Sequence, residues 1–195
     1  ANGGATLVDA KYFYCITYTK LSGTTISNEL ICYDIESWTE VSRKAIPLKT
    51  ISTDMTWNPA DQKVYGAFYN TTKNGYVFGT LNLETGAVNK LSDITLQDDK
   101  GYPAGFVVIA ANSIGEVYGI SQMGDLYKFN TEDGSYSLIG ATGYTPLYQQ
   151  SGCFDFTTKQ LYWAACNENS SGIYQVNTDT GEATLLGSFN DLEEF

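Results

Sequence analysis

Residues 151–187 read SGCFDFTTKQLYWAACNENSSGIYQVNTDTGEATLLG, and this stretch decides the fold. It contains four short runs of apolar, β-branched or aromatic residues, at 153–156, 161–166, 173–176 and 183–186. Polar stretches rich in Asn, Thr, Ser and Gly separate the runs. Short runs bounded in this way are typical of β-strands joined by tight turns. The stretch therefore predicts one sheet of four antiparallel strands.

The same pattern occurs four times along the chain. Tyr14, Tyr65, Tyr118 and Tyr162 hold corresponding places in the copies, and their spacing of about 50 residues is the period of propeller blades. An Asn-rich or acidic turn follows the third run, and it closes with glycine except in the first copy, which has Trp38. The sequence thus predicts an all-β fold, a β-propeller of four-stranded antiparallel blades. About four blades are expected, approximately at 4–46, 51–92, 104–140 and 150–187.

The sequence leaves three possibilities for how the blades form a ring. Four blades can form a small ring, but most propellers contain more blades. The chain can therefore be a closed four-bladed ring, a segment of a larger propeller with missing blades from a longer chain, or a half-ring that pairs in a homodimer. An uncovered blade would leave apolar surface and sheet edges exposed, which favours a partner.

The charge balance excludes some partners. With 11 Lys and Arg against 22 Asp and Glu, the formal net charge is −11, which repels nucleic acid and anionic lipid. No transmembrane run or signal peptide is visible, so direct membrane insertion is not expected. Because the sequence does not begin with Met, we expect any targeting segment to lie outside it. The composition suits an extracellular, periplasmic or cell-surface domain.

The four cysteines bear on the redox compartment. Cys153 and Cys166 are symmetric about residues 159–160 in a turn, and Cys15 and Cys32 are symmetric about residues 23–24 in a loop of the first copy. If each pair lay opposite in its hairpin, the disulfides Cys15–Cys32 and Cys153–Cys166 could form. The alternative is that all four are small buried apolar residues.

The absence of histidine excludes much chemistry. The chain has no His, so Ser-His-Asp and Cys-His catalysis and His-ligated metal sites are ruled out. No nucleotide or cofactor motif is present, so we expect no cofactor, no metal and no catalytic residue. A catalytic site built from a pair of carboxylates remains possible without His, because glycoside hydrolysis needs only two suitably spaced Asp or Glu residues. Asp54, Asp155 and Asp9 lie in or near expected inner strands, but alignment of the blades points Asp54 and Asp155 to opposite faces.

The stretch 177–182 places oxygen-bearing side chains at alternate positions, as calcium loops do. A strand follows directly and the later ligands are missing, so an Asx-type hairpin turn is the preferred interpretation.

Aromatic residues outside the strands point to a binding surface. In a propeller, the links between blades and the loops between second and third strands gather on one rim. Tyr side chains stack on apolar patches of sugars and peptides, while amides donate and accept hydrogen bonds. The ligand-binding residues expected on this rim are Tyr102, Tyr144, Tyr148, Gln149, Asn70 and Asn167. The alternative is that these side chains only seal the ends of the blades.

The segments 161–164, 172–177 and 180–181 resemble the repeat of bacterial secreted β-propellers of the quinoprotein-like and lactonase-like superfamilies. They are also weakly similar to the Tyr-Trp-Thr-Asp repeat of receptor propellers. The resemblance covers the whole chain, but its motifs are structural and imply the fold rather than an activity. It also implies a bacterial surface location, as for uncharacterised exported proteins of gut-type bacteria.

Together these patterns predict a non-catalytic, exported β-propeller that binds a protein, peptide or glycan through one rim. A His-free carbohydrate-active enzyme, a glycosidase or lyase using Asp and Glu, is the first alternative. A structural module of a larger adhesin or scaffold is the second.

Overall fold

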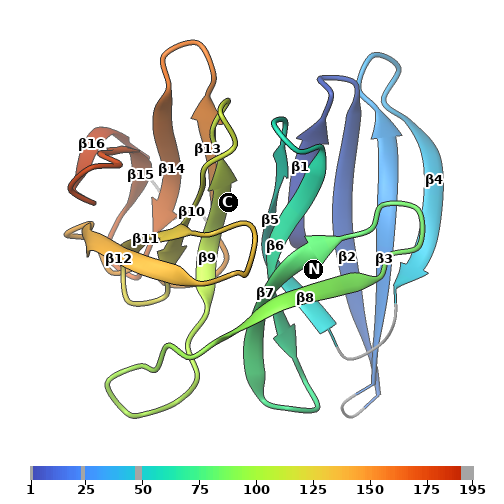
Figure 1. The fold of residues 1–195 in the computed structure, drawn as a ribbon, viewed down its shortest axis with the longest axis horizontal. Helices are drawn as coiled ribbons and strands as arrows, with labels where there is room; N and C mark the ends of the chain where they lie inside the picture. The colour runs from blue at the N-terminus through green and yellow to red at the C-terminus, as the bar shows by residue number, and fades with distance from the viewer. Residues whose placement is uncertain (1, 23–24, 47–49, 190–195) are drawn as a thin grey trace.

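The computed structural model describes residues 2–22, 25–46 and 50–189 and confirms the all-β fold (Figure 1). Its strands form four antiparallel sheets of four strands each. The first two sheets contain β1 (Asn2–Val8), β2 (Tyr12–Ser22), β3 (Thr25–Asp34), β4 (Thr39–Ile46), β5 (Thr50–Asn58), β6 (Lys63–Asn70), β7 (Gly75–Leu81) and β8 (Val88–Ile94). The other two contain β9 (Phe106–Ala111), β10 (Val117–Ser121), β11 (Asp125–Phe129), β12 (Tyr136–Ala141), β13 (Ser151–Asp155), β14 (Gln160–Cys166), β15 (Ser171–Val176) and β16 (Ala183–Ser188).

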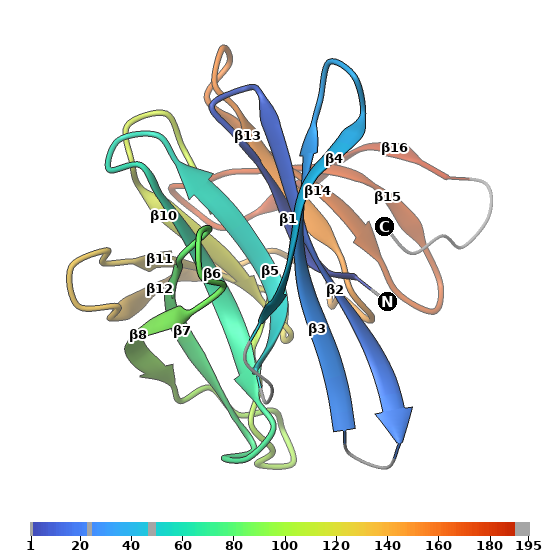
Figure 2. The ribbon, with the colours of Figure 1, turned by 90° about the vertical axis from the view of Figure 1, so that its right-hand side faces the viewer.

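The four sheets are consecutive blades of a β-propeller, as expected. Within each blade the strands pair in chain order, and the first strand is innermost. The inner strand β5 lies against β1 (Figure 2). On its other side β5 contacts β9, and β13 also lies against β9. Over the described ranges, no helix is long and apolar enough to cross a membrane.

The turn between the third and fourth strands shows why the repeat has its Asn. The Asn82 side-chain oxygen accepts the backbone N–H groups of Glu84 and Thr85 at 2.8 and 2.9 Å. Gly86 closes the turn with φ of 71° and donates its N–H to the Asn82 carbonyl. The third and fourth blades form the same turn at Asn130 and Asn177. This geometry confirms the Asx-turn interpretation of the repeated motif.

Glycine at these turns also allows close blade packing. A Cβ atom on Gly134 would lie 2.7 Å from Leu91 Cβ in the preceding blade, and one on Gly86 would collide with Ile46. Trp38 holds the same place in the first blade, with φ of 52° and 66% of its surface exposed. Its ring lies 6.1 Å from that of Phe13. The bulky side chain fits because, in the described structure, no outer strand of another blade packs against this turn.

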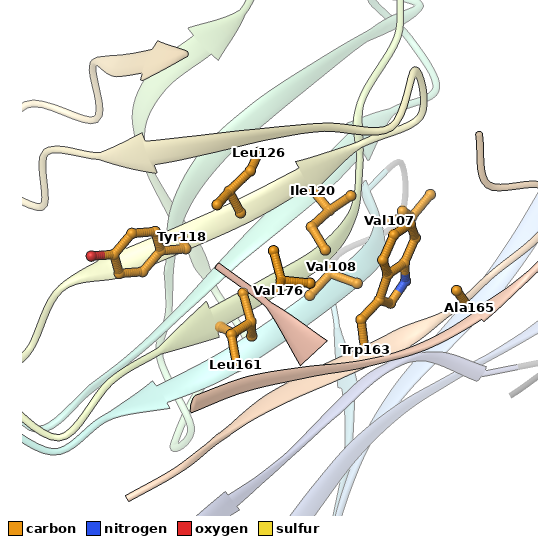
Figure 3. Close-up of a cluster of buried hydrophobic side chains, with 10 residues drawn as sticks. Val107, Val108, Tyr118, Ile120, Leu126, Leu161, Trp163, Ala165 and Val176 are labelled. Carbon is orange, nitrogen blue, oxygen red and sulfur yellow. The ribbon is translucent and has the colours of Figure 1, made fainter. Parts of the chain in front are cut away.

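Three apolar clusters join successive blades. One lies between the first and second blades and another between the second and third. The cluster between the third and fourth blades contains the fully buried Trp163 together with Val108, Ile120 and Leu161 (Figure 3). Side chains on alternate positions of each strand point to opposite faces, so both faces of a middle blade are filled. No comparable cluster joins the fourth blade to the first within the described residues.

Polar side chains link the inner strands of neighbouring blades. Thr6 Oγ1 accepts the N–H of Trp57 at 2.7 Å, and Thr56 Oγ1 accepts that of Ala111 at 3.1 Å. The carboxyl of Asp54, which is only 5% exposed, accepts the N–H of Ile109 at 2.7 Å. These bonds satisfy backbone donors that face the centre of the propeller, where no adjacent strand pairs with them.

The hairpin registers assumed for the two disulfides are wrong. Cys15 pairs with Ile31 and Cys32 with Tyr14, so the two thiols point to opposite faces of the first blade. Cys153 pairs with Tyr162, four residues away from Cys166. The structure therefore forms neither of the two predicted disulfides. Turn symmetry misled the prediction because the Cys15 hairpin is longer than expected and carries an irregularity near its tip.

Candidate functional site

A pocket lies at the rim where the inner strands begin, which we call the lower rim after its place in Figure 1. Its volume is about 550 Å³. All four blades or the links between them contribute to its lining, and none of the described lining residues is charged. The residues are Tyr18, Thr53, Tyr76, Phe106, Val107, Gln122, Pro146, Leu147, Tyr148 and Gln149.

Two β-bulges aim residues into this pocket. In β5, Ser52 pairs with Phe68 and Asp54 with Ala67, so Thr53 between them is the extra residue. Val107 is the extra residue at the corresponding place in β9. A bulge shifts the register by one residue and redirects a side chain. Both extra residues belong to the pocket lining, and Val107 is at the same time part of the buried cluster between the third and fourth blades.

Tyr76 and Gln122 form a braced polar wall. The Gln122 side-chain oxygen accepts the N–H of Gly105 at 2.9 Å, and the Gln122 backbone N–H donates to the Gly105 carbonyl. The Tyr76 hydroxyl interacts with the Gln122 side chain, while burial raises the pKa of Tyr76. The Tyr76 ring lies so close to Gly105 that a Cβ there would be 2.5 Å from the nearest ring atom. Glycine at position 105 thus lets this tyrosine pack inward.

Tyr148 lies on the pocket wall in a strained conformation. Its φ is 67°, in the left-handed region that bulky side chains rarely adopt, and its side chain is 60% exposed. Such strain persists only where the surroundings hold it, and it is concentrated at functional sites. An exposed aromatic ring held at this cost is the clearest local sign of a binding role in the pocket.

The buried side chain of Gln150 holds this loop in place. Its amide nitrogen donates to the carbonyls of Leu147 and Cys166 at 2.7 and 2.5 Å. Its oxygen accepts the indole N–H of Trp163 at 2.8 Å. The N–H of Leu147 also donates to the Cys166 carbonyl. The residue before Tyr148 is therefore fixed to the core of the fourth blade.

Replacing Tyr148 with glycine is expected to raise the free energy of unfolding by about 0.5–1 kcal/mol, because relief of left-handed strain exceeds the added chain entropy. Urea unfolding measures this change. Tyr102→Gly is the matched control, since Tyr102 is 65% exposed and is not among the residues with positive φ. Its replacement should lower stability. A Tyr148→Gly protein less stable than the parent would contradict the strain.

The structure brings two of the six expected ligand-binding residues into the pocket, Tyr148 and Gln149. Tyr102 lies outside it, in a turn where its N–H donates to Asp98 Oδ1 at 2.8 Å. The expectation that Tyr102 shares a site with Tyr148 therefore has no support from the lining of the pocket.

The other three expected residues have structural contacts. The Tyr144 ring packs against Trp163 and Tyr174, and its hydroxyl donates to the Ser170 carbonyl at 2.7 Å. Asn70 and Asn167 each accept two backbone N–H groups in Asx turns. These contacts match the alternative in which such side chains seal the blade ends.

Sequence reasoning missed Tyr18, Tyr76 and Gln122. Tyr18 and Tyr76 lie in β2 and β7, and tyrosines within strands are usually core residues. Gln122 directly follows β10. The signal that could have found Tyr76 is Gly105, because a glycine at the start of an inner strand makes room for a neighbouring ring.

The aspartates considered for catalysis do not form an acid–base pair at this pocket. Burial raises the pKa of Asp54 well above its usual range, but Asp54 does not line the pocket. The Thr158 hydroxyl and the Thr157 N–H lower the pKa of Asp155, which lies at the opposite rim. Glycosidases need a carboxylic acid with a raised pKa beside a second carboxylate. In the part of the chain that the structure describes, no cluster of acidic or sulfur side chains could hold a metal ion.

Comparisons with known proteins reveal the fold. No family model matches the sequence, and no curated protein is similar to it. A Bacteroides caccae protein of unknown function superposes with a TM-score of 0.55 at 13% identity, over 97% of this chain and 60% of that one. A chain of the nidogen/laminin complex superposes with a TM-score of 0.63 at 16% identity, over 92% of this chain and 62% of that one. Puromycin hydrolase superposes with a TM-score of 0.56 at 13% identity, over 99% of this chain and 30% of that one.

At these identities the similarity shows the β-propeller fold alone. The chain spans about 60% of the length of the first two of these relatives.

Proposed function

We propose that this protein is a non-catalytic binding module that recognises an uncharged glycan or peptide at the lower-rim pocket. The observation that carries the proposal is the wall of exposed and half-buried tyrosines and amides around about 550 Å³, with no charge on any lining residue that the structure describes. Sites for small ligands are concave and largely apolar, with a few fixed polar groups. The braced Gln122 and the strained Tyr148 supply such groups on a rigid scaffold.

The lining chemistry favours a neutral ligand. Tyr rings offer a flat apolar face for stacking and a hydroxyl for hydrogen bonding. The amides of Gln122 and Gln149 can both donate and accept. A charged ligand would lose its hydration here without gaining an ion pair, which is costly. Sugars and extended peptides meet these conditions.

Solved propellers of similar fold include a partner in a protein complex and a hydrolase, so the fold alone does not separate binding from catalysis. Two observations support binding. The chain has no His, and Asp54, whose pKa is raised by burial, lies outside the pocket, while Asp155, whose pKa is lowered by hydrogen bonds, lies at the opposite rim. An extracellular, periplasmic or cell-surface location is part of the proposal. It is supported by the aromatic-rich all-β composition and by the likeness to Bacteroides proteins.

Arrays of neutral oligosaccharides and peptides test the proposal. Tyr148→Ala is expected to weaken binding of the best array ligand about 10-fold or more, the loss typical of an aromatic residue central to a site. Tyr102→Ala should leave the affinity unchanged, because Tyr102 is equally exposed but lies outside the pocket. Mass spectrometry of the bound ligand after incubation should find it intact.

An equal loss of affinity in the two variants would contradict binding at this pocket. Cleavage of the ligand would favour the alternative of a carbohydrate-active enzyme.

A further inference from the structure

A second pocket is lined by residues where the inner strands end. We call this end of the strands the upper rim, because it is opposite the lower rim and uppermost in Figure 1. Its volume is about 620 Å³. It lies between the turns that follow β1, β5 and β13 and includes the end of β9. The lining residues that matter here are Leu7, Asp9, Trp57, Phe154, Asp155 and Phe156.

Two carboxylates face this pocket without a cationic neighbour. Within the described ranges neither Asp9 nor Asp155 forms an ion pair, and no Lys or Arg belongs to the lining. The Asp155 oxygens accept the Thr157 N–H at 2.8 Å and the Thr158 hydroxyl at 2.7 Å, which fixes the carboxylate in its turn. Asp9 lies in a tight hairpin turn with φ of 52°. The pocket therefore carries uncompensated negative charge.

Aromatic and aliphatic side chains complete the wall. Phe156 and Leu7 are 48% and 45% exposed, which is unusual for apolar residues beside a cavity unless something covers them. The Trp57 backbone is held by Thr6 Oγ1, and the Phe154 ring lies 5.5 Å from that of Tyr118. Both aromatic residues are therefore anchored to the scaffold, while Phe156 remains open to a ligand.

We propose that the upper-rim pocket binds an organic cation on an apolar body, the chemistry of an arginine or lysine side chain. Carboxylates attract the charged group and can accept its N–H donors. Aromatic faces contact both the cation and its aliphatic stem. The net charge of −11 adds a long-range attraction for cations. This pocket differs from the lower-rim pocket in its position and in the charge of its lining. The experiments on cation binding therefore test a different proposal from those on the lower-rim pocket.

N-acetyl-arginine methylamide and its neutral citrulline counterpart are the probes. The two have nearly the same shape, and citrulline replaces one NH2 group of the guanidinium with an oxygen, so the probes differ in the positive charge and in that one donor group. We expect the arginine probe to bind at least 10-fold more tightly, with an affinity that falls at high salt because screening weakens exposed charge pairs. Binding is followed by the indole N–H signal of Trp57 in NMR spectra, assigned with Trp57→Phe. Equal affinity of the two probes would overturn the proposal.

Asp9→Asn removes one charge with little effect on the fold, because Asn tolerates positive φ as well as Asp does. We expect it to weaken arginine binding about 3- to 10-fold, as for a partly exposed ion pair. Glu168→Gln is the control of equal charge change, at an exposed loop position outside this pocket. It should leave the affinity unchanged. An equal loss in both variants would mean that only net charge acts, and it would overturn the site.

Asp155→Asn gives a second measurement at the other carboxylate. It also should weaken arginine binding, and circular dichroism checks that the turn is retained. A pentapeptide with one central arginine shows whether the cation is best presented on a peptide. Tighter binding of the peptide than of the single residue would support a peptide source, and equal binding would support a small molecule. No shift of the Trp57 signal with any of these probes would overturn the proposal.

Discussion

Replacing Gln150 with leucine is expected to lower the free energy of unfolding by about 3 kcal/mol and to abolish ligand binding at the lower-rim pocket. The substitution leaves the buried indole N–H of Trp163 without its acceptor, which costs about 1–3 kcal/mol. It also removes the donor to the Leu147 and Cys166 carbonyls. Each of these two lost bonds adds about 0.5–1.5 kcal/mol.

The loss of binding has a separate cause. Leu147 precedes Tyr148, and the Gln150 amide fixes its carbonyl. Without that bond, the loop can relax from the left-handed conformation at Tyr148, so the aromatic ring no longer has one fixed position. The pocket loses its preorganised wall even if the blade still folds.

Urea unfolding and binding to the best array ligand measure the two effects. Gln97→Leu is the control, because Gln97 is exposed and lies outside the pocket. It should change stability by less than about 0.5 kcal/mol. In a double-mutant cycle, Trp163→Phe removes the indole donor, so Gln150→Leu should cost less in that background. If the changes in unfolding free energy of the two single substitutions add up in the double variant, the Trp163–Gln150 hydrogen bond contributes nothing to stability.

Asp54→Asn is expected to stabilise the protein, by an amount that grows as the pH rises above about 4. Burial raises the pKa of Asp54 well above the usual range, despite the N–H groups of Ile109 and Met55 that lower it. In the unfolded chain this carboxyl ionises near pH 3.9. Between that pH and the raised folded pKa, the folded state holds a proton that the unfolded state has lost.

The sign follows from proton linkage. Unfolding releases a proton over this interval, so rising pH favours the unfolded state, by up to about 1.4 kcal/mol for each pH unit. Below the unfolded pKa both states are protonated and the penalty disappears. Asparagine stays neutral at every pH and still offers an oxygen to the Ile109 N–H. The variant therefore escapes the penalty and keeps the link between the second and third blades.

Urea unfolding at pH 4, 5.5 and 7 tests the prediction, with Asp99→Asn as an exposed control. The stability difference between Asp54→Asn and the parent should increase from pH 4 to pH 7, and the control should show no such trend. Parallel pH profiles would mean that Asp54 is ionised in the folded protein.

Much of the fold was predictable because blades are local structures. Each four-stranded sheet comes from a continuous segment, and Asn82, Asn130 and Asn177 mark its last turn in the sequence itself. Hydrogen bonds between residues two or three apart need no information from distant parts of the chain. The disulfide prediction failed because it depended on strand register, which packing decides.

The candidate site was predictable only in part. Tyr148 and Gln149 stand out as polar and aromatic residues in a long link between blades. Tyr76 and Val107 could not be distinguished from core residues, because their direction depends on Gly105 and on a bulge in β9. Such features involve residues that are distant in sequence or one position out of register, and a strand pattern shows neither.

The sequence by itself determined the repeat, the turns and the absence of histidine chemistry, because these depend on residue type and short-range spacing. Only the tertiary structure decided which side chains meet at the two rims, since these come from different blades. It also explains why Trp38 replaces glycine in the first blade, where no outer strand of another blade packs against the turn within residues 2–22, 25–46 and 50–189. Contacts between blades depend on how whole sheets pack, and that is fixed only when their apolar faces come together.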